Sequence, residues 1–97
     1  MQTSQTVFSH ALELIERRAL RQSEAALRQT IALAEAEDNK LILGGALCQL
    51  GELLMSQRRT LEARPLLERL VAIQRNDNAL LFEVDRAQEL LGMRAAQ

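Results

Sequence analysis

The sequence lacks most of the residue types that carry chemistry or cross-link a fold. Its 97 residues include no tryptophan or tyrosine, two phenylalanines, one proline, one histidine and one cysteine. A single cysteine excludes an intrachain disulfide and fits a reducing compartment. One histidine and one cysteine also fall short of the four ligands of a structural zinc site. We therefore expect no metal, no other cofactor and no enzymatic activity.

Excess charge and long apolar segments are also missing. Twelve basic and thirteen acidic residues give a net charge of −1, so no general attraction to nucleic acid or anionic lipid is expected. Residues 1–6 lack the basic start and apolar stretch of a secretory signal. No apolar run approaches the roughly 20 residues that span a bilayer. These absences predict a cytoplasmic protein that binds neither nucleic acid nor membranes.

What the sequence does contain is an internal repeat with a spacing of 40 residues. Moved forward by 40, residues 7–33 fall on residues of similar kind: Val7 on Leu47, Ala11 on Gly51, Leu14 on Leu54, Ile15 on Met55, Ser23 on Ala63, Leu27 on Leu67, Ile31 on Val71, Ala32 on Ala72 and Leu33 on Ile73. In a half-copy 41 residues on, Leu43, Ala46, Leu50 and Gly51 are matched by Val84, Ala87, Leu91 and Gly92. Such a period is typical of stacked units, none of which buries its apolar face alone.

The apolar spacing predicts an all-α fold of five amphipathic helices in a single domain, residues 1–97. The first helix is expected over about 6–20, and the second after a cap at Ser23. The third would follow a cap at Asn39 and end near Gln57, the fourth would follow Thr60 to about residue 75, and the fifth would run from a cap at Asn78 toward Met93. Repeat 1 then spans about 6–38, repeat 2 about 39–77, and the closing helix about 78–95. Short connections predict that successive helices are antiparallel neighbours.

The third helix differs from the others because apolar residues cover about three-quarters of its circumference. Such a helix is expected to lie centrally, packed on most sides. Gly44, Gly45 and Gly51 would each cost about 1 kcal/mol relative to alanine, which indicates close approach of neighbouring helices. Pro65 falls in the second turn of the fourth helix, where the strong apolar spacing that follows predicts that the helix continues.

The residue order in the second copy resembles a tetratricopeptide repeat. The stretch Leu47-Cys48-Gln49-Leu50-Gly51-Glu52-Leu53-Leu54, followed by Ala63-Arg64-Pro65-Leu66-Leu67, has the family's intervals with aliphatic residues in place of aromatic ones. It is also similar to the long-period repeats of bacterial activators of the LuxR and maltose-regulon type. The resemblance implies a right-handed stack of helical hairpins, two repeats plus a closing helix. HEAT-type repeats are the structural alternative.

The resemblance also implies a concave groove lined by the odd-numbered helices. Mapped onto this sequence, the groove residues are Phe8, Ser9, Leu12, Ile15 and Glu16; Cys48, Gln49, Glu52 and Met55; and Arg86, Glu89, Leu90 and Met93. Carboxylates among Phe, Leu, Ile and Met favour an amphipathic helix or an apolar peptide, with a basic flank, as the bound segment. On the fifth helix, Phe82 and Met93 lie opposite a predicted core stripe made of Leu80, Val84, Ala87 and Leu91. They are either a contact surface or scattered surface apolar residues.

Four other features have two interpretations each. Cys48 is expected to be a small apolar packing residue rather than a nucleophile, and His10 to pack between helices rather than act as a base. The run Glu35, Glu37, Asp38 and Asn39 lacks the glycine turn and closing glutamate of a calcium loop, which favours a solvated helix end. The arginine pairs 17–18 and 58–59 suit the carboxyl ends of helices, or an acidic partner.

Together these observations predict a protein–protein interaction module, a small bacterial chaperone or adaptor such as those that serve secretion systems. The alternative is a regulatory or oligomerisation domain in transcriptional or signalling control. About three repeats are usually needed for a stable stack, and this chain has two and a half. The ends of so short a stack are also expected to leave apolar surface uncovered. We therefore expect a homodimer or an obligate complex with another protein, formed through the groove or the outer face of the fifth helix.

Overall fold

The computed structural model describes residues 2–74 and 81–92, with the backbone alone at residues 74 and 81–84. These residues form five α-helices and no β-strand: α1 (Ser4–Glu16), α2 (Leu20–Glu37), α3 (Lys40–Ser56), α4 (Thr60–Gln74) and α5 (Leu81–Leu91). The prediction of an all-α chain with five helices is confirmed.

The bounds of α1 and α2 differ from the prediction. The first helix begins earlier, at Ser4, because the Oγ1 of Thr3 accepts a hydrogen bond from the Thr6 N–H at 3.2 Å and caps it. It ends at Glu16, and α2 begins at Leu20. Ser23 is therefore not the cap of α2 but a buried residue in its first turn, where its hydroxyl donates to the Ala19 carbonyl at 2.7 Å.

The second half of the chain follows the prediction more closely. Asn39 caps α3, its Oδ1 accepting from the Ile42 N–H at 3.1 Å. Thr60 is the first residue of α4 rather than its cap, and α4 continues through Pro65. The predicted cap at Asn78 lies outside the described residues.

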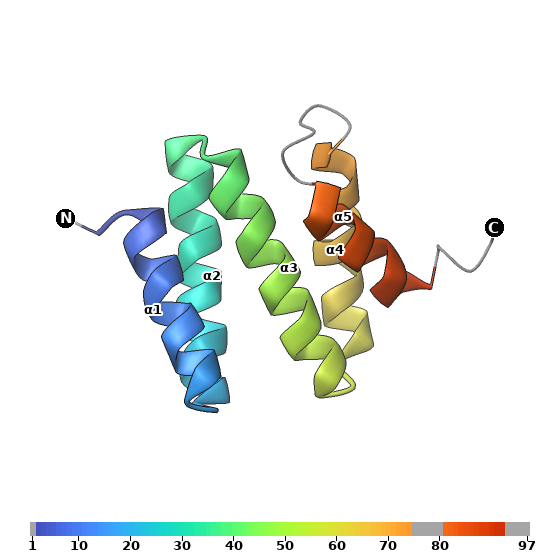
Figure 1. The fold of residues 1–97 in the computed structure, drawn as a ribbon, viewed down its shortest axis with the longest axis horizontal. Coiled ribbons are helices and arrows are strands. Elements are labelled where there is room, and N and C mark those ends of the chain that lie inside the picture. Colours follow the sequence, from blue (N-terminus) through green and yellow to red (C-terminus); the bar gives the residue numbers. More distant parts are fainter. Residues whose placement is uncertain (1, 75–80, 93–97) are drawn as a thin grey trace.

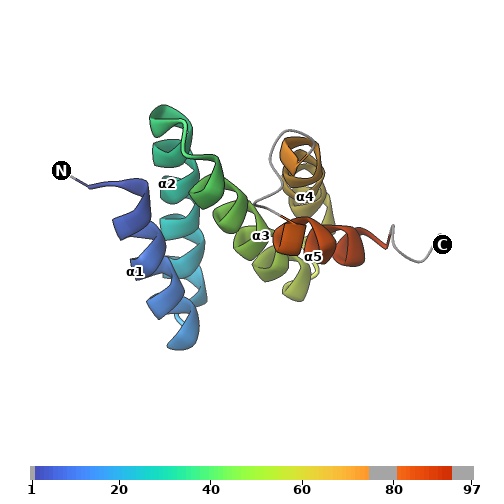
Figure 2. The same ribbon diagram turned by 45° about the horizontal axis from the view of Figure 1, so that its top comes forward.

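Figures 1 and 2 show α1, α2, α3 and α4 side by side in sequence order, with α5 against the later part of the row. The third helix contacts all four others, and α5 contacts both α3 and α4. Nine residues of α3 are buried, so its predicted central position is confirmed. We call α1 and α2 the first helix pair, and α3 and α4 the second helix pair.

The 40-residue repeat is visible in the turns that join the helices of each pair. Arg18 and Arg58 both have φ of 62°. The Arg18 N–H donates to the Ile15 carbonyl at 3.0 Å, and the Arg58 N–H to the Met55 carbonyl at 3.0 Å. One residue later, the N–H groups of residues 19 and 59 donate to the carbonyls of residues 14 and 54, at 2.9 and 2.8 Å. Two segments of different sequence thus make the same turn.

Two glycines of α3 allow neighbouring side chains to approach closely. A Cβ at Gly51 would lie 2.9 Å from Cγ of Leu67 on α4, and a Cβ at Gly45 would lie 3.0 Å from Cζ of Phe8 on α1. Both distances are shorter than an ordinary van der Waals contact. Glycine therefore replaces a better helix former here because helix packing requires the space.

Candidate partner-binding face

The odd-numbered helices contact in succession, α1 to α3 and α3 to α5, which gives the described structure a continuous side. In the described part of the chain, α1 contacts α3 and α3 contacts α5, whereas α2 and α4 make no backbone contact. The helices α1, α3 and α5 are therefore closer together than α2 and α4. We call the exposed side of α1, α3 and α5 the inner face.

A hollow of about 620 Å³ lies on the inner face between the later halves of α1 and α3. Its lining comes from both helix pairs: Ile15, Glu16, Arg18, Leu20, Gln49, Glu52, Leu53 and Ser56. Four of the predicted groove residues thus line one hollow: Ile15, Glu16, Gln49 and Glu52. Arg18 and Leu20, from the turn after α1 and the start of α2, were not predicted, because the turn was expected to be helical.

Two residues expected in the groove have other positions. Phe8 is half-buried because its ring lies against Gly45, so it joins α1 to α3. Cys48 is buried in the core, and its thiol donates to Oε2 of Glu52 at 3.8 Å. The expectation that Cys48 is a packing residue agrees with this burial, whereas its expected place in an open groove is wrong.

Other predicted apolar residues remain accessible outside the hollow. Leu12 of α1 is 36% exposed, and Met55 of α3 and Leu90 of α5 are half-buried. Met55 and Leu90 pack against the core on one side, and all three side chains keep part of their surface open to solvent.

The acidic character expected of this face is partly neutralised by α5. Arg86 donates from Nε and Nη2 to Oε1 of Glu52, at 3.0 and 2.9 Å, and from Nη1 to Glu89. The hydrogen bonds to Glu52 are the main cause that raises the pKa of Arg86 above its usual value, with Glu89 adding to it. The predicted residues Glu52, Arg86 and Glu89 thus form one ion-paired group between α3 and α5.

The prediction about Phe82 and Met93 concerns side chains outside the described residues. The described part of α5 matches the predicted core stripe where it can be compared: Ala87 is buried and Leu91 is half-buried. The helix ends at Leu91, and Gly92 has φ of 77°. Gly92 therefore follows a helix end, unlike Gly51 in the middle of α3.

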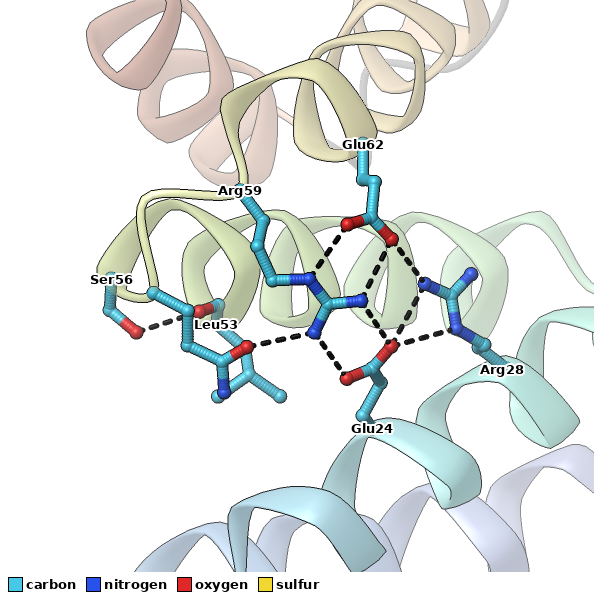
Figure 3. A network of polar contacts seen from close by, with 7 residues as sticks. Glu24, Arg28, Leu53, Ser56, Arg59 and Glu62 are labelled. Atoms are coloured by element: carbon cyan, nitrogen blue, oxygen red, sulfur yellow. Dashed lines mark hydrogen bonds and ion pairs between the residues drawn. The ribbon is translucent and has the colours of Figure 1, made fainter.

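The largest group of polar contacts, drawn in Figure 3, was not predicted. Arg59 lies in the turn before α4, where its guanidinium donates to Glu24 of α2 at 2.7 and 3.0 Å. It also donates to Glu62 of α4, twice at 2.7 Å, and to Gln57. Arg28 pairs with Glu24 at 3.0 Å and approaches Glu62 at 3.7 Å. Arg59 therefore joins two carboxylates rather than only the carbonyls at the end of α3.

This network shifts the ionisation of its members. Hydrogen bonding to Arg59 is the main reason why the pKa values of Glu24 and Glu62 lie below their usual range. The same two carboxylates, Glu62 most strongly, raise the pKa of Arg59. Glu62 follows Arg59 by three residues, which a helix pattern can suggest, whereas Glu24 is 35 residues away and carries no sequence signal for this pairing.

The acidic run at the end of α2 holds helix ends together. The carboxylate of Glu37 accepts from the N–H of Ser4 at 2.9 Å and from its hydroxyl at 2.6 Å. These bonds, the hydroxyl first, lower the pKa of Glu37. Glu35 forms an ion pair with Arg69 of α4. Among the side chains that the structure describes, no three of His, Cys, Asp or Glu are placed to hold a metal ion.

His10 is exposed, which corrects the expectation that it packs between helices. It lines a hollow of about 360 Å³ with Gln2, Thr6, Val7, Ala26 and Gln29, on the side of the first helix pair turned away from α3. In the described structure no helix covers this side of α1. A polar side chain there keeps its contact with water and loses no hydration on folding.

Among the described helices none has the length and apolar composition of a membrane span. A scan against models of known protein families found no match, and searches of curated proteins and of solved structures also found none. The tetratricopeptide resemblance therefore stays a prediction from the sequence.

Proposed function

We propose that this chain is a tetratricopeptide-like protein-binding module. In this proposal the two helix pairs are antiparallel hairpins of two successive repeats, and α5 closes the stack. The matching turns at residues 17–19 and 57–59, with the same hydrogen bonds and the same positive φ, support it. The burial of equivalent residues supports it as well, since Val7 and Leu47, and Leu27 and Leu67, are buried in both copies.

The inner face would bind an amphipathic or apolar segment of a partner protein, as a small bacterial chaperone or adaptor in the cytoplasm does. The observation that carries this proposal is the hollow between α1 and α3, which has the apolar side chains of Ile15 and Leu20 in its wall and the exposed Leu12 on the same face. An open hollow with apolar walls and a few polar groups is the usual form of a binding site. The partner helix would place its apolar stripe here.

Charge would have a smaller part in this recognition. Glu16 and Arg18 carry opposite charges at the same hollow, and Glu52 already pairs with Arg86. A basic side chain at the edge of the bound segment would therefore meet Glu16. The affinity would come mainly from apolar contact.

The test is affinity capture from the source cytoplasm with three forms of the protein. The double variant Leu12→Glu, Met55→Glu places charge on the inner face, while Leu61→Glu changes a leucine that is 88% exposed at the start of α4. We expect wild type and Leu61→Glu to capture the same protein, identified by mass spectrometry, and the double variant to lose it while keeping its helical circular dichroism. Identical capture by all three forms would contradict the proposal.

The alternative function, a regulatory or oligomerisation domain, predicts a different result in the same experiment. The captured protein would then be a second copy of this chain or a transcriptional or signalling protein. Sedimentation of the purified chain would show a homodimer that the inner-face double variant converts to monomer.

A further inference from the structure

Ion pairs, rather than backbone contacts, connect α2 to α4 and the turn before it, on the side away from the inner face. The helices α2 and α4 make no backbone contact in the described structure. Side chains cross between the pairs at both ends of α2: Glu24 meets Arg59 and Arg28 meets Glu62 near its start, and Glu35 meets Arg69 near its end.

The Glu24–Arg59 contact is the best formed of these connections. Each carboxylate oxygen of Glu24 accepts from one terminal nitrogen of Arg59, at 2.7 and 3.0 Å. The Glu24 side chain is only 18% exposed, and Glu62 holds the same guanidinium from its other edge. A bidentate pair with restricted access to water is stronger and more specific in direction than an ordinary surface ion pair.

This contact lies at the end of the molecule where the hollow opens. Arg59 follows Ser56 in the turn after α3, and Glu24 is four residues after Leu20 at the start of α2. Leu20 and Ser56 both line the hollow. Figure 3 shows Ser56 and Leu53 on the helix that leads into Arg59. The Glu24–Arg59 pair therefore links the two segments that form the walls of the hollow.

At the other end, α1 and α3 touch directly. The ring of Phe8 lies against Gly45, where an added Cβ would come within 3.0 Å of it. Phe8 and Gly45 lie in the first halves of α1 and α3, whereas the hollow is lined by the later halves. The Phe8–Gly45 contact can serve as a pivot between α1 and α3. The distance that varies is then the one at the other end, between the start of α2 and the turn after α3.

We propose that the Glu24–Arg59 pair is an ionic latch that holds the start of α2 to the turn after α3 and thereby sets the width of the inner-face hollow. Opening the latch widens the hollow and weakens the binding of a partner, a consequence that rests on the proposed function. Because ion pairs near a surface are screened by salt, ionic strength controls the width.

The width can be measured without knowing the partner. Spin labels at Glu16→Cys and Ser56→Cys, in a Cys48→Ala background, report the distance between the two walls by pulsed electron paramagnetic resonance. Arg59→Met removes the positive charge of the pair and keeps much of the apolar stem. Glu24→Gln removes the negative charge. Glu68→Gln is the matched control, since among the described side chains Glu68 pairs with Arg64 of its own helix, at 4.0 Å, and with none of the first helix pair.

We expect a longer mean distance and a broader distribution in Arg59→Met and in Glu24→Gln, and an unchanged distribution in Glu68→Gln. The labelled wild type should move in the same direction in 1 M salt, where the screening length is about 3 Å. Unchanged distances in both latch variants, with helical content retained, would overturn the proposal. If Arg59→Met does not fold, Glu24→Gln decides.

Measurements of partner affinity then distinguish a failure of the latch hypothesis from a failure of the proposed function. With the captured partner and unlabelled protein, Arg59→Met should weaken binding about fivefold, the factor that corresponds to about 1 kcal/mol. A widened hollow with unchanged affinity would overturn the regulatory role and leave the binding function standing. Unimpaired binding by Leu12→Glu, Met55→Glu would instead refute the proposed function, whatever the labels show.

Discussion

The side of α1 that is turned away from α3, here called the outward side, is polar and exposed. The equivalent side of α3, 40 residues later, is apolar and buried. On α1 and its cap this side consists of Thr3, Thr6, His10 and Glu13, all of which are exposed. The residues 40 positions later, Leu43, Ala46, Leu50 and Leu53, are each at most 8% exposed. The two helices are otherwise equivalent, since both pack on the next helix in the same register. The difference follows from the neighbouring helices. The first helix pair packs against this side of α3, whereas no described helix packs against this side of α1.

The comparison extends to α5 at the other end of the described structure. In α3, Leu47 is completely buried, and Gly51 accommodates Leu67 of α4. The position of α5 that corresponds to Leu47, 41 residues later, is the half-buried Gln88, and the position that corresponds to Gly44 is the exposed Asp85. Both end surfaces thus carry the polar residues that terminal units of a helical stack need for solubility.

This composition bears on the predicted self-association. One reason for expecting a homodimer was that the ends of a short stack would leave apolar surface uncovered. The described ends are polar instead, which favours contact through the inner face. The homodimer stays a prediction, and its proposed contribution from Phe82 and Met93 concerns side chains outside the described residues.

The largest expected effect comes from equivalent positions with opposite surroundings. Leu50→Ala should lower the free energy of unfolding by about 2–5 kcal/mol, because it leaves a cavity between the helix pairs. His10→Ala, at the equivalent place on α1, should change it by less than about 0.5 kcal/mol. Urea denaturation followed by circular dichroism measures both. Similar losses in the two variants would mean that α1 is covered as α3 is.

Gly51→Leu tests the closest helix contact of the second pair. Because Leu67 leaves no room for a side chain at this position, overfilling should cost about 1–3 kcal/mol or more. Gly45→Ala is the milder comparison, because its Cβ needs only a small shift of the half-buried Phe8 ring, 3.0 Å away, and alanine gains helix propensity. A melting temperature for Gly51→Leu within about 2 °C of wild type, when 1 kcal/mol corresponds to about 4–8 °C, would contradict the packing.

A third experiment places the apolar residues of the outward side of α3 at the equivalent positions of α1. The combined substitutions Thr3→Leu, Thr6→Ala, His10→Leu and Glu13→Leu copy the buried stripe onto an exposed surface, and should cause association through that end. Sedimentation velocity should show a larger species than wild type at equal concentration. Ala25→Leu with Ala32→Leu, which adds exposed apolar area on α2 without this pattern, should sediment as wild type does. An unchanged sedimentation coefficient for the four-substitution variant would argue against an interface stripe.

The contrast between the uncovered α1 and the covered α3 also bears on what could be predicted from the sequence. Apolar spacing located the five helices, Asn39 marked the start of α3, and the nearly all-apolar circumference of α3 indicated its central position. Ser23 was misread because a serine that donates to a carbonyl four residues back looks, in sequence, like a helix cap. The His10 environment depended on which helix lies beside α1. The Glu24–Arg59 pair joins residues 35 apart through tertiary packing, which no local pattern encodes.

The smallest expected effect concerns a hydroxyl contact of the first helix pair. Ser4 bonds to Glu37, while the residue 40 positions later is Gly44, which has no hydroxyl. Ser4→Ala should therefore lower the melting temperature slightly at pH 7.

The sign of the pH dependence follows from the lowered pKa of Glu37. A carboxyl whose pKa is lower in the folded state stabilises the fold fully above its ordinary value of about 4.3, and the stabilisation is lost as the pH falls through the lowered value. The difference in melting temperature between wild type and Ser4→Ala should thus be present at pH 7 and shrink on acidification below about pH 4. Wild type should itself lose stability there, because Glu24 and Glu62 are held in the same way. Thr3→Ala, which removes an uncharged cap worth about 0.5–2 kcal/mol, is the control with a penalty independent of pH. An equally pH-independent penalty for Ser4→Ala would show that Glu37 does not stabilise α1 through its charge.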